Sequence, residues 1–376
     1  MVENWNRRTS RKDFDGPRKN RDTKGHVVGM EKVELCLVGA GRAGTVHAKN
    51  LSNNVPSAVL KAIVDPNAKA AGKLASETGV ARCYSSLDDA IAGVDFDAVV
   101  VTTPTFTHAE LAKLAASAGK HVFCEKPMAL SLGEAEEMIS TCRAHNVSLQ
   151  IGFMRRFDEG FLKAKEMIED GKIGDVTIIK STGRGPGLPP RWACDPKTSL
   201  GMLAEVNSHD FDSVRWLAGS EYSRVYADAG TFKCFDLKKD FPDFYDNSIV
   251  SLRFRNGTLG LIDGSCPVEY GYDARMEVLG TKGVIMIGAL EDTALALCTK
   301  EEGVVTSAFP SWRDRFKDAY ISEIRHFVEC ILEDREPVLT GEDGKKAVEI
   351  VLAATKSILT GEPVELPLPQ GFKLPR

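Results

Sequence analysis

The stretch that decides the fold spans residues 33–44 and reads VELCLVGAGRAG. Apolar residues fill most of its first half, and three glycines follow at positions 39, 41 and 44. A buried strand that runs directly into a G-x-G-x-x-G turn and then into a helix is typical of the first βα unit of a doubly wound sheet. The stretch therefore predicts an α/β protein with a parallel sheet.

The glycine turn also predicts a dinucleotide site. Gly39 permits the tight turn, Gly41 lets the backbone approach a diphosphate, and Gly44 allows the helix to pack closely on the strand. The amides of Arg42 and Ala43 lie where the positive end of the helix dipole would meet phosphate.

The choice of dinucleotide is indicated by Asp65, which ends the next β-rich run, 26 residues after Gly39 (65 − 39). A carboxylate at this place accepts hydrogen bonds from ribose hydroxyls and repels a 2′-phosphate. The sequence thus favours NAD over NADP as cofactor, although Arg42 could contact a phosphate.

Outward from this stretch, short apolar runs alternate with amphipathic ones, as in a sheet covered by helices on both faces. We expect strands at residues 33–38, 59–64, 98–102, 121–124 and 148–151, and helices at 69–77, 108–118 and 132–145. We assign residues 30–151 to an NAD-binding Rossmann domain. Residues 1–29 are polar and basic without periodicity, so we expect a disordered tail, with a basic binding arm as the alternative.

The pattern changes after about residue 152. Longer β-rich runs appear at residues 176–181, 249–254, 258–263 and 276–287, and Asn256-Gly257 is a strong hairpin signal between two of them. Two helical segments follow at residues 320–333 and 341–359. We expect residues 152–376 to form a C-terminal α+β domain with an open, mostly antiparallel sheet that binds substrate and mediates oligomerisation.

Composition excludes several classes of protein. The chain has 376 residues and a formal net charge of −5, which gives no reason to expect nucleic acid or an anionic membrane as partner. No run reaches the roughly 18 apolar residues of a membrane-spanning helix. The nine cysteines form no C-x-x-C pair, so we expect no metal site, buried thiols and a reducing, cytoplasmic location.

Two further segments each end a predicted strand: Thr103-Pro104, followed by His108, and Glu125-Lys126-Pro127. In such sheets the cofactor crevice lies at the carboxyl ends of the strands. We therefore expect both segments to face the nicotinamide, with His108 fixing the loop after Pro104.

With the runs GFMRRFD at residues 152–158, EVNSHDFD at 205–212 and YGYDAR at 270–275, these motifs resemble the Gfo/Idh/MocA oxidoreductase family, most of all its inositol 2-dehydrogenase branch. The resemblance extends from about residue 33 to the C-terminus. It implies two domains, a homodimer or homotetramer, and a catalytic group that maps to Lys126, Glu205 and His209. Many inositol dehydrogenases carry Asp where this chain has Glu205.

These three residue types suit the oxidation of an alcohol. An imidazole titrates near neutral pH, so His209 is a sensible general base. Glu205 precedes it by four residues, and on one helical face its carboxylate could orient the imidazole or contact a substrate hydroxyl. Lys126 could hydrogen-bond the reacting oxygen and stabilise developing alkoxide charge.

Further polar side chains are candidates for contacts to a hydroxyl-rich substrate. Tyr270 and Tyr272 alternate with Gly271, which in a strand puts both on one face; sheet packing is the alternative for them. The arginine pair at 155–156 could instead form interdomain salt bridges. The full candidate set is Arg156, Asp158, Arg184, Asp212, Tyr270 and Tyr272.

The sequence thus predicts an NAD-dependent dehydrogenase that oxidises a secondary hydroxyl of a small polyol or sugar, with a myo-inositol-like cyclitol first and a glycoside ring hydroxyl second. Two other classes stay open. One is a redox-neutral enzyme that cleaves glycosides with retained NAD, and the other is a non-catalytic sugar or NAD sensor. The joint presence of Lys126, Glu205 and His209 argues against the sensor.

Overall fold

The computed structural model describes residues 32–374, so the basic tail predicted at residues 1–29 lies outside the described residues. The first part of the described chain is a six-stranded parallel sheet of order β3-β2-β1-β4-β5-β6. Its strands are β1 Val33–Val38, β2 Ala58–Val64, β3 Arg82–Tyr84, β4 Ala98–Val101, β5 His121–Glu125 and β6 Leu149–Gly152. Its helices are α1 Arg42–Asn53, α2 Ala68–Thr78, α3 Leu87–Gly93, α4 His108–Ser117 and α5 Leu132–Ala144, with a 3₁₀ turn η1 at Thr105–Thr107.

The central strands of this sheet are buried on both faces, which explains their continuous apolar sequences. In β1, Leu35 and Leu37 pack toward α1 and α2, whereas Cys36 and Val38 pack toward α3, α4 and α5. The predicted α/β class and all five predicted strands are confirmed. The short strand β3 and helix α3 were not predicted, because they are three and seven residues long, too short to show a clear period of apolar residues.

The second sheet has seven strands in the order β12-β11-β7-β10-β9-β8-β15. All neighbouring pairs are antiparallel except β7 and β10. Its strands are β7 Val176–Arg184, β8 Tyr222–Gly230, β9 Asn247–Phe254, β10 Leu259–Ser265, β11 Asp273–Gly280, β12 Val284–Ile287 and β15 Val364–Glu365. The predicted open, mostly antiparallel sheet is confirmed, and Asn256-Gly257 forms the turn between β9 and β10.

One predicted strand in this region needs correction. Residues 276–287 form two strands, β11 and β12, because the chain reverses between Gly280 and Gly283. Gly280 also packs so closely on the backbone of Ile173 that a Cβ atom there would lie 2.2 Å from its carbonyl oxygen.

Helices cover one face of the second sheet. Contacts join α14 to β8, α10 to β7 and α6 to β12. The helices of this region are η2 Met154–Phe157, α6 Glu159–Glu169, α7 Arg191–Cys194, α8 Pro196–Ser199, α9 Met202–Glu205, α10 Ser208–Ala218, α11 Phe235–Asp240, α12 Trp312–Arg315, α13 Lys317–Leu332 and α14 Gly341–Thr360. The opposite face carries exposed apolar side chains, among them Ile249 of β9 and Met286 of β12.

Helix α13 belongs to the C-terminal part of the sequence but packs against the first sheet. Its residues Ile324, Phe327 and Val328 are fully buried in one apolar cluster with side chains of β1, β2, β4 and α1. The second-half helix therefore completes the core around the N-terminal strands.

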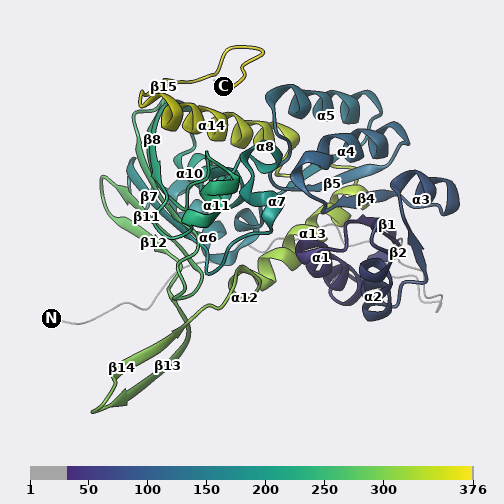
Figure 1. Ribbon diagram of the computed structural model, residues 1–376, viewed down its shortest axis with the longest axis horizontal. Coiled ribbons are helices and arrows are strands. Elements are labelled where there is room, and N and C mark those ends of the chain that lie inside the picture. The colour runs from purple at the N-terminus through teal and green to yellow at the C-terminus, as the bar shows by residue number, and fades with distance from the viewer. Residues whose placement is uncertain (1–31, 375–376) are drawn as a thin grey trace, which may run out of the picture. The chain divides into compact units, whose positions relative to one another are not determined.

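A two-stranded hairpin, β13 Glu291–Thr299 and β14 Gly303–Ala308, projects from the rest of the described chain (Figure 1). Leu295 and Val304 on this hairpin are about three-quarters exposed. Among residues 32–374, no helix is both long and apolar enough to cross a membrane.

Candidate active site

The glycine turn after β1 is packed as tightly as its sequence suggests. Gly39 has a φ of +101°, and a Cβ atom there would lie 2.8 Å from the carbonyl group of Thr102. A Cβ atom on Gly44 would lie 1.9 Å from the carbonyl oxygen of Gly39. Gly41, in contrast, faces open space, with no atom of the described residues within 4 Å of a Cβ built there.

The start of α1 fits an anionic group. Its N-cap residue, Gly41, supplies no side-chain hydrogen bond, and the first turn contains no acidic residue. The free amides of the helix, including those of Arg42 and Ala43, therefore face the open space beside Gly41 with the positive end of the helix dipole. This cradle suits the diphosphate of a dinucleotide.

Asp65 lies at the same turn, as predicted for a ribose contact. Its Oδ2 accepts a hydrogen bond from the Ala40 amide at 2.7 Å, and its Oδ1 accepts one from the Asn67 amide at 2.8 Å. Each carboxylate oxygen keeps a second lone pair for a hydroxyl donor. The carboxylate is thus fixed beside the glycine turn.

His108 ties together the loops that follow β4 and β5. Its Nδ1 lies 2.8 Å from the carbonyl oxygen of Pro127, and its Nε2 lies 2.8 Å from that of Thr103. The ring is buried. This geometry supports the loop-fixing role, and it holds the backbone of Thr103 just after the carboxyl end of β4.

Lys126 joins the two halves of the chain. Its Nζ donates to the backbone carbonyl oxygen of Glu205 at 2.6 Å. Burial lowers the pKa of Lys126, and the charges of Glu205 and Glu125 oppose that shift. The ammonium group is therefore held at the end of the first sheet by a carbonyl group of the second half.

Glu205 and His209 do not share one helix, contrary to our expectation. Helix α9 ends at Glu205 and α10 begins at Ser208, so the chain changes helix between them. The Glu205 carboxylate accepts from the Thr105 hydroxyl at 2.9 Å, and no described contact joins it to the imidazole. Burial raises the pKa of Glu205, while Lys126 opposes the rise.

The His209 side chain is only 6% exposed, and its Nδ1 has no hydrogen-bond partner among the described residues. Its ring meets that of Phe153 edge to face. Burial, and then the nearby charges of Lys126 and Arg155, hold the pKa of His209 well below its usual range. The imidazole is therefore neutral at neutral pH.

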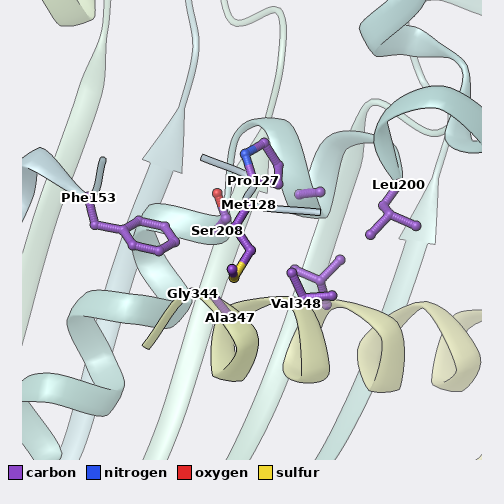
Figure 2. Close-up of a pocket in the computed structure, with 10 residues that line it drawn as sticks. Pro127, Met128, Phe153, Leu200, Ser208, Gly344, Ala347 and Val348 are labelled. Carbon is purple, nitrogen blue, oxygen red and sulfur yellow. The ribbon is translucent and has the colours of Figure 1, made fainter. Parts of the chain in front are cut away.

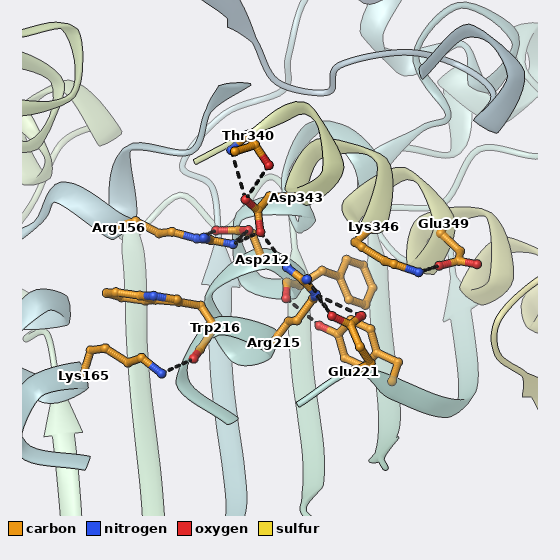
Figure 3. Close-up of polar contacts among 12 residues, drawn as sticks. Arg156, Lys165, Asp212, Arg215, Trp216, Glu221, Thr340, Asp343, Lys346 and Glu349 are labelled. Atoms are coloured by element: carbon orange, nitrogen blue, oxygen red, sulfur yellow. Dashed lines mark hydrogen bonds and ion pairs between the residues drawn. The ribbon is translucent and has the colours of Figure 1, made fainter. Parts of the chain in front are cut away.

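Two predicted substrate residues bind each other instead (Figure 3). Arg156 donates from Nε and Nη2 to the two carboxylate oxygens of Asp212, at 2.9 and 2.6 Å. Asp343, at the start of α14, accepts from Arg156 and from Arg215. This buried network uses Arg156 in salt bridges, but its members all lie within residues 152–376, so these are not the interdomain bridges of the alternative. The geometry gives no support to a substrate contact by Arg156 or Asp212.

Asp158 is likewise used within the protein. Its side chain caps α6 by accepting from the Gly160 and Phe161 amides, and its Oδ2 lies 2.8 Å from Nη1 of Arg315. Both oxygens of the Asp158 carboxylate thus make contacts within the protein, and its contact with a substrate stays a prediction.

The expectation that Tyr270 and Tyr272 share one face of a strand is wrong. Both precede β11, and Gly271 between them has a φ of +134°, so the backbone is not extended. Tyr270 is half exposed and bonds Arg184, whose guanidinium also pairs with Asp263. Tyr272 is buried, with its ring edge to face with another aromatic ring.

Two residues that were not predicted support the site directly. Thr105 binds the Glu205 carboxylate, and it directly follows the Thr103-Pro104 motif. Arg155, fully buried, donates to Asp210 at 2.6 Å beneath His209. In the sequence, Thr105 is marked only by its place next to the Thr103-Pro104 motif. Arg155, in contrast, lies inside the GFMRRFD motif at residues 152–158.

A small apolar cavity lies behind these residues, bounded by Pro127, Phe153, Ser208 and the start of α14 (Figure 2). The cavity has room for about one water molecule. The buried Ser208 Oγ has no hydrogen-bond partner within residues 32–374, so it could bind such a water. The cavity is too small for a sugar.

A six-stranded parallel sheet with a glycine turn that fits a diphosphate, beside a buried lysine and a neutral imidazole, defines an NAD-binding oxidoreductase. The chain belongs to the Gfo/Idh/MocA family. Residues 33–153 match the family described as "Oxidoreductase family, NAD-binding Rossmann fold", and residues 165–366 match its "C-terminal alpha/beta domain".

Individual relatives match nearly the whole described chain. A myo-inositol 2-dehydrogenase of Thermotoga maritima is 37% identical, over 89% of this chain and 98% of its own. A scyllo-inositol 2-dehydrogenase (NAD(+)) of Bacillus subtilis is 34% identical, over 91% and 98%. The crystal structure of a Lactobacillus casei scyllo-inositol dehydrogenase with bound NAD(H) and scyllo-inositol is similar with a TM-score of 0.82 and 28% identity, over 89% and 99%.

Proposed function

We propose that this protein is an NAD-dependent dehydrogenase that oxidises one secondary hydroxyl of an inositol-class cyclitol to a ketone, with release of NADH and a proton. One observation carries the proposal: at the carboxyl ends of the first sheet's strands, Lys126 donates a hydrogen bond to the Glu205 backbone, and its charge acts on the nearby His209. The relatives named as myo- and scyllo-inositol dehydrogenases support the substrate class. A ring hydroxyl of a sugar or glycoside is the next substrate class to test.

The residues that would hold NAD are those of the glycine turn. The α1 amides beside Gly41 would bind the diphosphate, and Asp65 would accept from the adenosine ribose. Thr103, Pro104 and Glu125 border the crevice where the nicotinamide would lie. When bound, NAD supplies the hydride acceptor, and the chain supplies position and proton transfer.

His209 is the proposed general base. It is neutral at neutral pH because burial and two nearby cations disfavour its charged form. A neutral imidazole in a nearly closed site can accept the proton of the substrate hydroxyl as the hydride leaves the same carbon.

Lys126 is the proposed donor to the reacting oxygen. Its ammonium group carries three N–H donors, and the Glu205 carbonyl oxygen takes one of them. The others are free to stabilise the negative charge that develops on the substrate oxygen. Glu205, held by Thr105, places its carboxylate in the same site, where it can accept from a neighbouring hydroxyl.

The test is the initial rate of NADH formation with NAD and with NADP, using myo-inositol, scyllo-inositol, glucose, xylose and a simple glucoside. The parent should turn over an inositol with NAD. His209→Gln and Lys126→Met should each lower kcat by roughly 10²-fold or more. NADH binding, followed by fluorescence, should stay intact in both variants.

A matched control is Lys163→Met, which removes an exposed lysine that pairs with Glu166 three residues on. Its kcat should equal that of the parent. Bound NAD without net NADH from any substrate would contradict the proposal, and cleavage of the glucoside in that sample would identify the redox-neutral enzyme instead.

We further propose that the protein is a cytoplasmic homodimer or homotetramer. Exposed apolar side chains on the uncovered face of the second sheet and on the β13–β14 hairpin support association with a second copy. The nine cysteines are all unpaired, which supports a reducing compartment.

A further inference from the structure

A buried polar cluster lies directly behind the Lys126 loop. It consists of His47 from α1, Glu125 from the end of β5 and Glu323 from α13. His47 Nε2 lies 2.7 Å from Glu125 Oε1, and one donor atom from each of the three residues lies within 4.8 Å of the others. The proposed reaction uses neither His47 nor Glu323.

Glu323 is the unusual member of this cluster. Its side chain is 0% exposed, and no N–H or O–H group of the described residues donates a hydrogen bond to either carboxylate oxygen. The rings of Phe123 and Tyr320 pack on the neighbouring imidazole, so the surroundings are largely apolar. An ionised carboxylate is too costly in such a place, and the group keeps its proton instead.

The charges around Glu323 act in the same direction. Burial, and then the negative charges of Glu125 and Asp212, raise the pKa of Glu323 well above its usual range. The other titratable groups nearby are the imidazole of His47 and the phenol of Tyr320. Asp212 is paired with an arginine, whereas an oxygen of the Glu125 carboxylate lies within 4.8 Å of an oxygen of Glu323 and is the charged acceptor available to its proton.

Glu125 links this proton to the active site. Its Oε1 binds His47, and its Oε2 accepts from the backbone N–H of Lys126 at 3.1 Å. The carboxylate packs closely on the backbone of Gly152, where a Cβ atom would lie 3.2 Å from Glu125 Oε2. A shift of the Glu125 carboxylate would therefore move the backbone from which the Lys126 side chain extends.

We propose that Glu323 is a positioning residue for Lys126: its carboxyl group keeps one proton and donates it to the Glu125 carboxylate, which in turn holds His47 and the Lys126 amide. This inference rests on the proposed function, because that function assigns Lys126 its role. Without the proton, two adjacent carboxylates would repel each other behind the lysine loop.

Two variants of similar size separate this role from simple packing. Glu323→Gln keeps an N–H donor toward Glu125, whereas Glu323→Leu has none. We expect kcat of the Gln variant within about threefold of the parent and that of the Leu variant about tenfold lower, the loss of roughly one hydrogen bond to a charged group. The NADH dissociation constant should be unchanged in both. Parental kcat in the Leu variant, or equal losses in both variants, would overturn the proposal.

The pH profile of kcat gives a readout that a packing role would not move. In the parent, Glu323 loses its proton at high pH and repels Glu125, so kcat should decline there. Glu323→Gln cannot ionise and should keep its kcat to higher pH. Superimposed alkaline declines in the two proteins would contradict the assignment.

The proton itself can be observed without any substrate. Infrared spectra of the ligand-free protein at pH 7 should contain a carboxylic-acid carbonyl band that Glu323→Gln removes. Absence of this band from the parent would refute the shared proton even if the dehydrogenase activity is found. Presence of the band would support the shared proton even if no dehydrogenase activity is found. Dialysis against EDTA should leave kcat unchanged, and a loss restored by zinc would show a metal in place of the proton.

Discussion

The two glycines that open α1 should respond to the same substitution in opposite ways. Gly44→Ala places a Cβ atom 1.9 Å from the Gly39 carbonyl oxygen and 2.8 Å from Thr102 Oγ1, so helix and turn must separate. Gly41→Ala meets no atom within 4 Å, and φ at Gly41 is −79°, which alanine readily adopts. The first change should damage the fold, and the second should damage cofactor binding alone.

The magnitudes follow from these contacts. Overpacking at Gly44 should lower the free energy of unfolding by about 1–3 kcal/mol or more. At Gly41 the gain from a less flexible unfolded chain, about 0.4–1 kcal/mol, is offset by the poor N-cap quality of alanine, so the net change should stay within about 1 kcal/mol. A methyl group in the diphosphate cradle should weaken NADH binding at least tenfold, about 1.4 kcal/mol.

Urea unfolding with and without NADH separates the two effects. At a ligand concentration of about 100 times its Kd, NADH should stabilise the parent by about 2.7 kcal/mol, and Gly41→Ala should lose about half of that or more at the same concentration. Parental stability in Gly44→Ala, or a parental NADH Kd in Gly41→Ala, would refute the reasoning from the glycine geometry.

Four further outcomes are expected. Asp65→Ala should raise the affinity for NADP and lower that for NAD, each by roughly tenfold in fluorescence titrations; unchanged selectivity would exclude the ribose contact. The pKa of His209 in the folded protein lies below its unfolded value near 6.5, so the free energy of unfolding should fall as the pH drops through about 6.5. In urea titrations, His209→Gln should show a weaker dependence of this free energy on pH, and an unchanged dependence would contradict the buried neutral ring. Asp212→Ala should cost about 1.5–3 kcal/mol of stability, since it removes the bidentate partner of the buried Arg156 guanidinium and leaves Asp343 as its counter-charge; a loss below 1 kcal/mol would show that the pair is dispensable. Leu295→Lys should shift the mass in analytical ultracentrifugation toward the monomer, whereas an unchanged mass would exclude the hairpin from the interface.

Five of the six strands of the N-terminal sheet, all but β3, could be predicted because the central strands are buried on both faces and consist of apolar runs. β1 was predicted to the residue, and the other predicted strands agree within one residue at either end. The hairpin of β13 and β14 was not predicted. Nearly all of its residues are exposed, so no alternation of apolar and polar residues marks it.

The candidate site could be predicted as a set of residues but not as a set of contacts. Lys126 meets a backbone carbonyl oxygen of Glu205, and no residue type specifies such a partner. Arg156 and Asp212 are 56 residues apart and look like substrate groups in the sequence, yet both are buried against each other. The motifs indicated which residues are candidates for the site, and the packing shows which of them are instead used in contacts within the protein.

The docking of α13 onto the first sheet has a consequence for how the protein is made. The apolar surface around Leu35 and Ile63 is closed by Ile324 and Phe327, almost 300 residues further along the chain (324 − 35). On the ribosome, the dinucleotide-binding half must therefore wait with that surface uncovered until α13 has emerged. A fragment that stops after β6 would keep the same surface bare, and it should aggregate rather than fold as an isolated cofactor-binding module.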